Sequence, residues 1–484
     1  FLPQTGLLLP FAAFFVPALL WLLFGKNSRG YGVCLLLGAL AGLLLTAHTR
    51  QKLDRVHTAY ADREVTLTAE VEEVSASYYP GVVHAVLRVE PTGGEKTVFR
   101  MECVCMPKCM AGERVQARFA LEVPSRTQQL SSYADGIALS GEYLSGMKHL
   151  GPSESFRAKT ARLQRRLSAA LRKGMAQGPA GVLAAMVLGD RTHLPKDLRS
   201  AYRAAGLSHV LVVSGMHVSI LCGSVFAKYL PEKKKWERGY ASRRRQALFS
   251  AAMALLLAGV TGLTPSVLRA ATAVWVSALG VWVYGPPDAL TSLGVAGVWM
   301  TLGNSYAVCD IGFELSFAAV LGTLAGAELA RKSRRFPLLR NSVLETLCVS
   351  ACASAATFPV LVLRGLSASL YALVSSVAVL WLVEPILQLG LATALLGCWP
   401  ALAPLHRVCS LCAATLAGCL NRWALWVSGW PGAQIYFDTA CAALVCLLLL
   451  GLGWLAYHWR VRLRVALPCL VLTAALAIGQ GSAK

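Results

Sequence analysis

VLETLCVSACASAATFPVLVL (Val343–Leu363) is one of the apolar blocks that decide the fold of this chain. It holds a single charged residue and is about as long as the ~20-residue helix that crosses the hydrocarbon core of a bilayer. Working outward along the 484 residues, the sequence repeats such blocks, so it predicts a multi-pass α-helical membrane protein of about 12 helices. The other blocks are Leu7–Phe24, Tyr31–Ala47, Leu207–Tyr229, Ala247–Leu263, Val267–Tyr284, Ala289–Gly303, Ile311–Ala330, Leu370–Val383, Ile386–Trp399, Thr439–Tyr457 and Val465–Ile478.

The composition agrees with this class of protein. Hydrophobic residues make up 56% of the chain and charged residues only 15%, whereas the 46 Lys and Arg outnumber the 25 Asp and Glu to give a net charge of +21. The 42 glycines lack a three-residue period and the 15 cysteines are diluted in a long chain, which excludes collagen-like and disulfide-scaffold proteins. Any interpretation has to account for both the apolar composition and the excess of basic residues.

Basic clusters in short loops predict the orientation, because Lys and Arg accumulate on the cytoplasmic side. These clusters are Lys26 with Arg29, the loop Lys228–Arg245, the loop Arg331–Arg340, and Arg460–Arg464. All four lie on the cytoplasmic side if Ala401–Asp438 forms interfacial helices that do not cross. The protein is then a multi-pass protein of the cytoplasmic cell membrane, with residues 48–155 and the C-terminus outside.

Four regions follow from this reading: two transmembrane helices in 1–47, a soluble domain in 48–155, a basic amphipathic helix in 156–178, and a polytopic domain in 179–484 with an interfacial segment near 401–438. The soluble domain alternates apolar and polar residues in five stretches, as strands do. This predicts an inserted, small, all-β, OB-like extracytoplasmic barrel. Its strands would be Glu64–Val74, Gly81–Val89, Thr97–Val104, Glu113–Val123 and Gly136–Leu144.

The function of this barrel stays open between two readings. OB-type barrels bind single-stranded nucleic acid through a basic face and stacking aromatic residues. Between His48 and Ser155, however, twelve basic residues face fourteen acidic ones, so the domain is slightly acidic. A spacer domain therefore explains the sequence as well as DNA binding does.

Three cysteines of the barrel, Cys103, Cys105 and Cys109, lie in an oxidising location if the domain is outside. Three thiols without a nearby histidine make an incomplete zinc site. We expect a hairpin disulfide between Cys109 and either Cys103 or Cys105, and no metal.

The stretch Phe156–Met175 is basic and contains no acidic residue. Leu163, Leu167 and Leu171 share one helical face, which we expect to contact lipid. The cationic face is either part of this lipid anchor or a surface that attracts a polyanion. Its cations are Arg157, Lys159, Arg162, Arg165, Arg166, Arg172 and Lys173.

The stretch Gly189–Leu221 places His209, Ser214 and His217 inside an apolar segment. Polar side chains at membrane depth are costly unless they have partners or line a wet cavity. The run Gly206-Leu207-Ser208-His209, continued by Ser214-Gly215-Met216-His217-Val218, resembles the hallmark of the ComEC family of competence proteins. Three further motifs match in order: Gly189-Asp190-Arg191 with Leu194-Pro195, Leu263–Ala270, and Asp310–Gly322.

This resemblance implies a channel that carries single-stranded DNA across the cytoplasmic membrane during natural transformation, with an OB-type domain after two leading helices. Two departures stand out. Glu314 occupies a position where the family usually has Gln, and none of the nine histidines forms the His-x-His-x-Asp pattern of the metallo-β-lactamase-like nuclease domain that many members carry. We therefore expect no enzyme activity and no cofactor, and a separate chain to supply the nuclease.

The mechanism we infer is conduction, because a DNA strand in a bilayer needs a wet path with cations for its phosphates. Arg191, Arg269 and Arg364 would contact phosphates, Asp190, Asp310 and Glu314 would be their counter-charges, and His209, Ser214 and His217 would line the path. For each single residue, a role in holding helices together explains the sequence equally well.

Two other classes fit part of the sequence. Ser214 with His209 or His217 could form an intramembrane serine hydrolase, although Ser214 and His217 share one helix. Asp310 and Glu314 could serve a proton-coupled small-solute transporter. The chain has no P-loop, so DNA transport would need a cytosolic ATPase or helicase or a gradient. Other expected partners are single-stranded DNA, membrane lipids, an outer DNA receptor, the separate nuclease and further copies of the chain.

Overall fold

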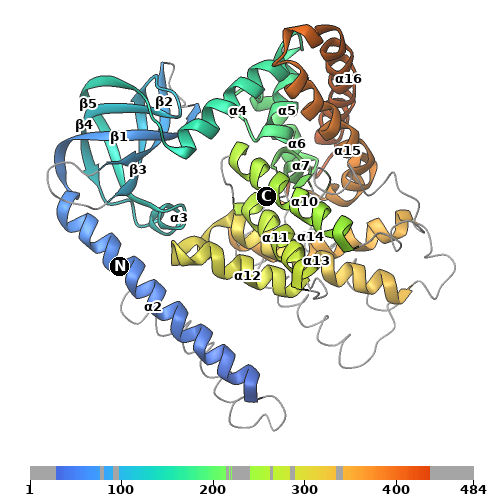
Figure 1. The fold of residues 1–484 in the computed structure, drawn as a ribbon, viewed down its shortest axis with the longest axis horizontal. Helices are drawn as coiled ribbons and strands as arrows, with labels where there is room; N and C mark the ends of the chain where they lie inside the picture. Colours follow the sequence, from blue (N-terminus) through green and yellow to red (C-terminus); the bar gives the residue numbers. More distant parts are fainter. Residues whose placement is uncertain are drawn as a thin grey trace. The chain divides into compact units, whose positions relative to one another are not determined.

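The computed structural model describes residues 29–76, 81–90, 98–213, 217–218, 220, 240–261, 265–283, 289–333 and 342–435. The chain divides into two compact units (Figure 1). The barrel unit comprises Phe1–Arg162 and Gly294–Asp310, and the helical unit comprises Leu163–Leu293 and Ile311–Lys484. Two boundaries fall inside the helices α4 (Phe156–Arg172) and α12 (Ala289–Leu302), and the third lies directly before α13 (Ile311–Ser333).

Five strands of the barrel unit close into a barrel in the order β1-β2-β3-β5-β4. Neighbouring strands are antiparallel except β3 and β5, which are parallel. The small OB-like barrel predicted from the sequence is thus present, and each strand overlaps its predicted stretch. The elements are β1 (Arg63–Ala76), β2 (Val82–Val89), β3 (Phe99–Pro107), β4 (Glu113–Glu122), the short helix α3 (Gln129–Ala134) and β5 (Ile137–Pro152).

The barrel core follows from the two-residue period of its strands, since alternate side chains point to the same face. In β1, Leu67, Ala69 and Val71 are buried, and in β4 Phe119 and Leu121 are fully buried. These side chains belong to one apolar cluster inside the barrel.

The predicted hairpin disulfide is wrong, because Cys103, Cys105 and Cys109 are free thiols. A break in the strand period explains this result, because the register of β2 and β3 shifts between the pairs Ala85–Cys103 and Val83–Met106. Cys103 points into the core, Cys105 is exposed, and the buried Cys109 contacts the sulfur of Met106 at 4.0 Å. Burial raises the pKa of the Cys103 and Cys109 thiols to about 11, so both stay protonated at neutral pH.

Helix α2 (Arg29–Tyr60) continues beyond the predicted block Tyr31–Ala47 and enters the barrel core. Val56 is 1% exposed, and the ring of Tyr60 lies 5.0 Å from that of Phe99. His57 donates a hydrogen bond to the carbonyl of Ala138 at 3.0 Å. The stretch after His48 is therefore first helical and only then β, because these apolar side chains follow the helical period into the core.

The segment Gly294–Asp310 belongs to the barrel unit, although more than a hundred residues separate it from the rest of that unit in the sequence. Its 3-10 helix η1 (Ser305–Cys309) begins after Asn304, whose side-chain amide donates to the carbonyls of Tyr133 at 2.6 Å and Ala134 at 3.1 Å. The rings of Tyr133 and Tyr306 lie 5.7 Å apart. One polar side chain thus fastens this segment to α3.

The helical unit is built around a short apolar helix, α5 (Gln177–Leu188), in which every residue from Ala180 to Leu188 is buried. Helix α5 contacts α15 and α16, and α10 packs on α11, as α13 does on α14. The remaining elements are α6 (Lys196–Ala204), α7 (Ser208–Leu211), α10 (Tyr240–Val260), α11 (Pro265–Val283), α13 (Ile311–Ser333), α14 (Ser342–Leu363), α15 (Ala372–Leu396), η3 (Pro400–Leu402) and α16 (Ala403–Ser428).

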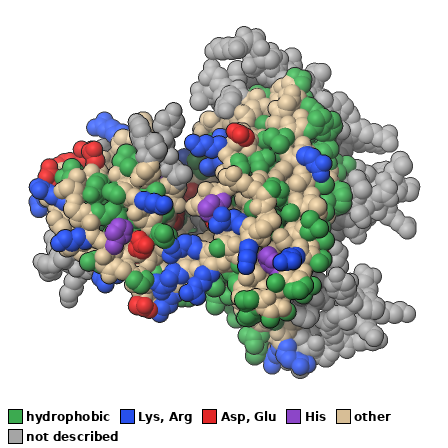
Figure 2. All heavy atoms as spheres, turned by 90° about the horizontal axis from the view of Figure 1, so that it is seen from above, with side chains coloured by type: hydrophobic (Ala, Val, Ile, Leu, Met, Phe, Trp, Pro, Cys, Tyr) green, Lys and Arg blue, Asp and Glu red, His purple; other side chains and the backbone are tan. Residues whose placement is uncertain are grey.

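Five helical stretches of the described residues are long and apolar enough to cross a membrane: Ser266–Val283, Ile311–Ala330, Thr346–Leu363, Ala372–Leu396 and Pro400–Ser428. Large apolar side chains on these helices, such as Val283 and Trp381, are exposed as lipid contact would require. Figure 2 shows broad areas of hydrophobic side chains on the surface. By length and composition, these helices are candidates for spans of a helical membrane protein.

Two predicted features of the membrane part change. The blocks Leu370–Val383 and Ile386–Trp399 are one helix, α15, which continues through Pro385, as membrane helices tolerate. The segment 401–438, expected to lie along the interface, contains the single helix α16, which is long enough to span. Because one predicted crossing is lost and one is gained, the number of crossings in this part is unchanged, and the sides of the loops stay a prediction.

The total of about 12 helices stays a prediction. The blocks Leu7–Phe24, Thr439–Tyr457 and Val465–Ile478 and most of Leu207–Tyr229 lie outside the described residues. The blocks Ala247–Leu263 and Val267–Tyr284 are mostly described and overlap α10 and α11, although α10 begins seven residues before its block, at Tyr240.

Candidate functional site

The Gly189-Asp190 motif forms the turn that ends α5. Gly189 has φ of +73°, and the N–H groups of Gly189 and Asp190 donate to the carbonyls of Ala185 and Ala184. The bond from Gly189 to Ala185 is that of the αL cap, in which the left-handed residue is usually glycine. The turn exposes Arg191 and brings the Asp190 carboxylate next to α4.

Asp190 accepts hydrogen bonds from hydroxyls. The Ser168 hydroxyl donates to it at 2.5 Å, and Thr192 donates through both its hydroxyl and its N–H, the latter at 3.0 Å. Burial alone would raise the pKa of Asp190, but these donors hold it below the usual value. Asp190 therefore links the turn after α5 to α4 through hydrogen bonds. The sequence had suggested two roles for it, a contact between helices or a counter-charge for an arginine.

The Gly206 end of the family motif is a second constrained turn. Gly206 has φ of +74°, and a Cβ atom there would lie 2.6 Å from Cα of Ala372. The Ser369 hydroxyl donates to the carbonyl of Ala204 at 2.6 Å. Glycine is required here both by the backbone conformation and by the close approach of α15.

The histidines of the motif lie just after this turn. His209 is hydrogen-bonded through Nδ1 to the carbonyl of Gly206 at 3.1 Å. His217 is buried, is hydrogen-bonded to the backbone of Val210, and is near enough to His209 to interact electrostatically. Ser214 lies outside the described residues, so the structure describes no geometry for a pairing of Ser214 with either histidine.

Helices α13 and α14 pack closely because α13 presents glycines. A Cβ atom at Gly322 would lie 2.5 Å from the carbonyl oxygen of Cys352, and one at Gly326 would lie 2.8 Å from Cα of Val349. Small residues four apart allow such backbone contact between membrane helices. This contact sets the start of α13 beside the end of α14.

Glu314 and Arg364 form a two-point ion pair across these helices. Arg364 Nε donates to one carboxylate oxygen of Glu314 at 3.0 Å, and a terminal nitrogen of Arg364 donates to the other. The two side chains are 29% and 27% exposed. Glu314 is in the first turn of α13 and Arg364 directly follows α14, so each charge opposes the partial charge of its own helix end.

Arg269 is a buried cation in the apolar helix α11. The residue is only 9% exposed, and its Nε atom has no hydrogen-bond partner. The part of the chain that the structure describes holds no carboxylate paired with it. Its neighbours along the helix, Val267, Ala270 and Ala271, lie in the main apolar cluster of the unit.

Asp310 belongs to the barrel unit, unlike the other residues of the expected DNA path. It caps η1, and its charge is one cause of the raised pKa of Asp135 on the barrel. The expectation that Asp190, Asp310 and Glu314 are counter-charges of the arginines stays a prediction. Glu314 has an arginine partner, Arg364.

Helix α4 confirms the helix expected in Phe156–Met175. Two of its cations, however, have acidic partners elsewhere in the barrel unit. Arg157 pairs with Glu72 at 2.9 Å and Lys159 with Glu154 at 3.1 Å. Arg162 donates to the carbonyl of Ser153 at 2.7 Å. The acidic partners come from outside the basic stretch, which is why the local sequence did not reveal them.

The apolar face of α4 is divided between protein and surface. Leu167 and Leu171 are buried in the core of the helical unit, whereas Leu163 is 41% exposed. The prediction that the whole face contacts lipid is wrong for the two buried leucines. Arg165, Arg166, Arg172 and Lys173 complete the cations of this helix, and Arg172 Nε donates to the carbonyl of Ser168 at 3.3 Å.

Two polar contacts in the helical unit were not expected from the sequence. The fully buried Tyr202 donates through its hydroxyl to the side-chain oxygen of Asn421 at 2.8 Å, which joins α6 to α16. Gln164 donates to the carbonyl of Leu188 at 2.6 Å. An asparagine in an apolar helix signals a buried partner, but no sequence feature identifies Tyr202 as that partner.

The described residues thus combine five apolar helices long enough to span a membrane, polar and charged contacts among the helices, and a separate small barrel. Residues 186–462, more than half of the chain, match the family described as "Competence protein". The chain therefore belongs to this family, and its resemblance to ComEC-type proteins is confirmed. The matched region lies mostly in the helical unit.

One relative is "ComE operon protein 3" of Bacillus subtilis (strain 168), which is 24% identical over 218 residues. The alignment covers 45% of this chain and 26% of that protein, so the chain matches about a quarter of the relative's length. No solved structure matches the chain significantly.

Proposed function

We propose that this protein takes part in DNA uptake for transformation and that its helical unit forms a path for single-stranded DNA across the cytoplasmic membrane. Membership of the competence family supports the biological process. The proposed activity is conduction through a polar path rather than covalent chemistry. The barrel domain would lie on the extracytoplasmic side of the membrane, and the basic loops on the cytoplasmic side.

The observation that carries the proposal is the buried Arg269. An ionised side chain in an apolar surrounding is strongly unfavourable unless it is paired or reaches water. Arg269 has no acidic partner among the described residues, and its Nε atom lacks a hydrogen bond. A cation kept in this state is available to a phosphate group, which guanidinium binds through parallel hydrogen bonds.

The Glu314–Arg364 pair supports the same path in a different way. Its guanidinium is neutralised by a carboxylate in a two-point arrangement. A phosphate can replace a carboxylate in this geometry, so the pair would hold Arg364 ready and screen its charge when no DNA is present. The cations of α4 and the exposed Arg191 would then attract the strand before it enters.

This proposal assigns further components to other chains. A path alone does not give direction, so a cytosolic ATPase or helicase, or a gradient, would drive the strand. An outer DNA receptor would deliver it, and a separate nuclease would degrade the complementary strand. Several copies of the chain could line one path.

The proposal is tested by DNA uptake in a competent host whose own gene is replaced with Arg269→Ala. We expect uptake of labelled DNA and transformation frequency to fall at least tenfold, while the amount of protein in the membrane is unchanged. Because removal of an uncompensated buried charge costs no stability, the thermal midpoint of the purified protein should not fall. The variant Arg269→Lys keeps the charge and should retain part of the uptake.

Arg407→Ala is the matched control, since this arginine is exposed on α16. It should leave uptake unchanged. Normal uptake by Arg269→Ala at normal protein level would remove Arg269 from the path. A loss in both variants would show that arginine number, and not the buried position, matters.

A further inference from the structure

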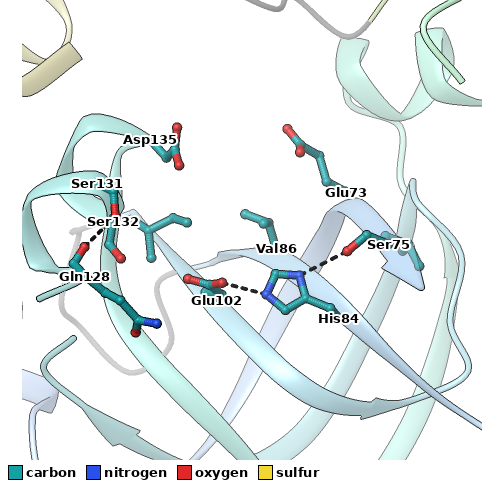
Figure 3. A pocket seen from close by; sticks show the side chains of 11 residues that line it. Glu73, Ser75, His84, Val86, Glu102, Gln128, Ser131, Ser132 and Asp135 are labelled. Carbon is teal, nitrogen blue, oxygen red and sulfur yellow. Dashed lines mark hydrogen bonds and ion pairs between the residues drawn. The ribbon is translucent and has the colours of Figure 1, made fainter. Parts of the chain in front are cut away.

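A cavity of about 360 Å³ opens on the barrel unit between strands β1 to β3 and the region of helix α3 (Figure 3). Its walls carry three carboxylates, from Glu73, Glu102 and Asp135, together with His84 and Ser132. Three further polar residues, Ser75, Gln128 and Ser131, complete the polar lining, and the apolar part comes from Val74, Val86 and Ile137. No Lys or Arg is among the lining residues.

The charges around the cavity leave an excess of negative charge. His84 is bonded to Glu102 at 2.6 Å, and this hydrogen bond is the main reason why the pKa of His84 is raised. The nearest guanidinium, from Arg100, pairs with Glu72 at 2.7 Å and lies 3.7 Å from Glu73. Glu72 also takes Arg157 as a partner. Arg100 also donates to the backbone carbonyl of Asp135, so these cations are already shared among several acceptors.

Asp135 reports this excess. Its pKa is raised to about 6, first by burial and then by the charge of Asp310, with smaller contributions in the same direction from Glu73 and Glu102. Arg100 opposes the rise but does not overcome it. A cation placed in the cavity would relieve the repulsion that raises this pKa.

Ser132 supplies an independent sign that the cavity is built for a ligand. The residue is 6% exposed and lines the cavity. Its backbone N–H bonds to the carbonyl of Gln128, but the described part of the chain gives its side-chain hydroxyl no hydrogen-bond partner. Because the rest of the residue is buried, the open cavity is the side from which a partner can reach this hydroxyl.

We propose that this cavity binds a small organic cation, an alkylammonium or guanidinium group, provided by a free polyamine or by a Lys or Arg side chain of a polypeptide. The carboxylates of Glu73, Glu102 and Asp135 accept its N–H donors, and the Ser132 hydroxyl adds a further acceptor. The apolar side chains on the wall contact the alkyl part. Glu73, Ser75 and His84 come from β1 and β2, and Asp135 follows α3, so the two sides of the cavity face each other across the ligand.

A metal ion fits this cavity less well. The described residues contain no group of three or more His, Cys, Asp or Glu side chains close enough to hold one. Carboxylates that are spread over a cavity of this size suit a ligand with several separate N–H donors. The same negative charge repels phosphates, so this face of the barrel is not a nucleic-acid surface. The inference is independent of the proposed DNA path.

The test measures binding to the full-length protein in a neutral maltoside detergent by calorimetry. Two probes separate the two sources of the cation: spermidine, and a short Gly-Arg-Gly peptide with blocked ends. We expect saturable binding of at least one probe at pH 7.5, and tighter binding by spermidine or by the peptide identifies a polyamine or a side chain. A failure of both probes to bind overturns the proposal.

The double variant Asp135→Asn, Glu73→Gln should bind at least tenfold more weakly. Ser132→Ala should lose a few-fold in affinity, and Ser132→Met should block the cavity without a change of charge. Glu122→Gln, on the exposed face of β4, is the matched control and should bind as the wild type does. Equal affinity in the wild type and in Ser132→Met, with both folded by circular dichroism, overturns the proposal even if the double variant fails to fold.

The pH dependence gives a further check. Above about pH 6 Asp135 is ionised, and as the pH rises further His84 loses its proton, so the cavity becomes more negative. Binding should therefore tighten from pH 5 to pH 7.5 in the wild type. The slope should be smaller in Asp135→Asn, and an unchanged slope would contradict the placement of the ligand beside Asp135.

Discussion

The barrel unit and the helical unit use charge in opposite ways. On the barrel, ion pairs such as Arg114–Glu90 and Arg118–Glu64 link strands on an exposed surface. In the helical unit, the charges that lie between apolar helices include Glu314, which is paired with Arg364, and the buried Arg269. Water screens the first kind of charge but not the second. The same residue types thus have different costs, and only the buried ones need a functional or structural reason.

Packing differs between the units in the same sense. The barrel core is filled by side chains that alternate along each strand, so the strands contact one another across the core through side chains. The membrane helices meet where side chains are missing, at Gly322, Gly326 and Gly206. Glycine in the helical unit is therefore a contact surface, whereas several glycines of the barrel face open space. Three substitutions test how far this contrast holds.

The largest effect is expected for Gly206→Ala, compared with Gly146→Ala on the barrel. Both glycines have φ of +74°, so the backbone strain of the new residue is the same. Around Gly206 the Cβ would lie 2.6 Å from Ala372 Cα, whereas nothing lies within 4 Å at Gly146. We expect the free energy of unfolding to fall by about 1 kcal/mol in Gly146→Ala because of backbone strain. In Gly206→Ala it should fall by about 2 kcal/mol more, because the new methyl group also overpacks the contact.

The measurement is the thermal midpoint and the yield of each purified variant in detergent. The paired design separates the two causes, because the left-handed conformation is common to both positions. Equal losses at the two glycines would mean that backbone strain alone matters. The close contact between the α6–α7 turn and α15 would then play no part in stability.

An intermediate effect is expected for Glu314→Met, which removes the partner of Arg364. We expect the cation left without its carboxylate to lower the free energy of unfolding by about 2 kcal/mol. This is less than for a fully buried ion pair, because both side chains are more than a quarter exposed. Glu314→Gln keeps one acceptor for the guanidinium and should lose about half as much. The free energy of unfolding in a denaturant series measures both.

The double variant Glu314→Met, Arg364→Met provides the control for this pair. If the cost comes from the stranded cation, the double variant should be more stable than Glu314→Met alone. Additive losses would instead show that the two side chains contribute separately. They would then not hold α13 and α14 together as a pair.

The barrel could be predicted from the sequence because its signal is local. Period-two alternation in stretches such as Glu113–Val123 fixes which side chains face inward, and the turns punctuate the strands. The order of the strands and the entry of Val56 and Tyr60 into the core depend on contacts distant in sequence. In the membrane part, apolar composition located most described helices, but Pro385 does not end α15, and composition alone could not separate one helix from two.

The candidate residues show the same limit. Their polarity in an apolar stretch indicated Glu314, Arg364 and Arg269, but the sequence could not pair Glu314 with a residue fifty positions away. The cavity on the barrel was not foreseen at all, since its lining is assembled from β1, β2, β3 and the region of α3. Only its acidity was visible, as the slight negative charge of the domain.

The smallest effect is expected for Arg118→Ala, which breaks the pair with Glu64 on β4 and β1. The nitrogen–oxygen distance is 2.8 Å, yet the side chains are 55% and 56% exposed. The Coulomb attraction in water and the entropy of fixing two long side chains nearly cancel, so the loss should be below about 1 kcal/mol. It should also vanish at 1 M salt, whereas the loss in Glu314→Met should persist, because salt screens exposed charges far more than partly buried ones. Unfolding curves of both variants at low and high salt make the comparison, and a salt-resistant loss at Arg118 would break the contrast between the two units.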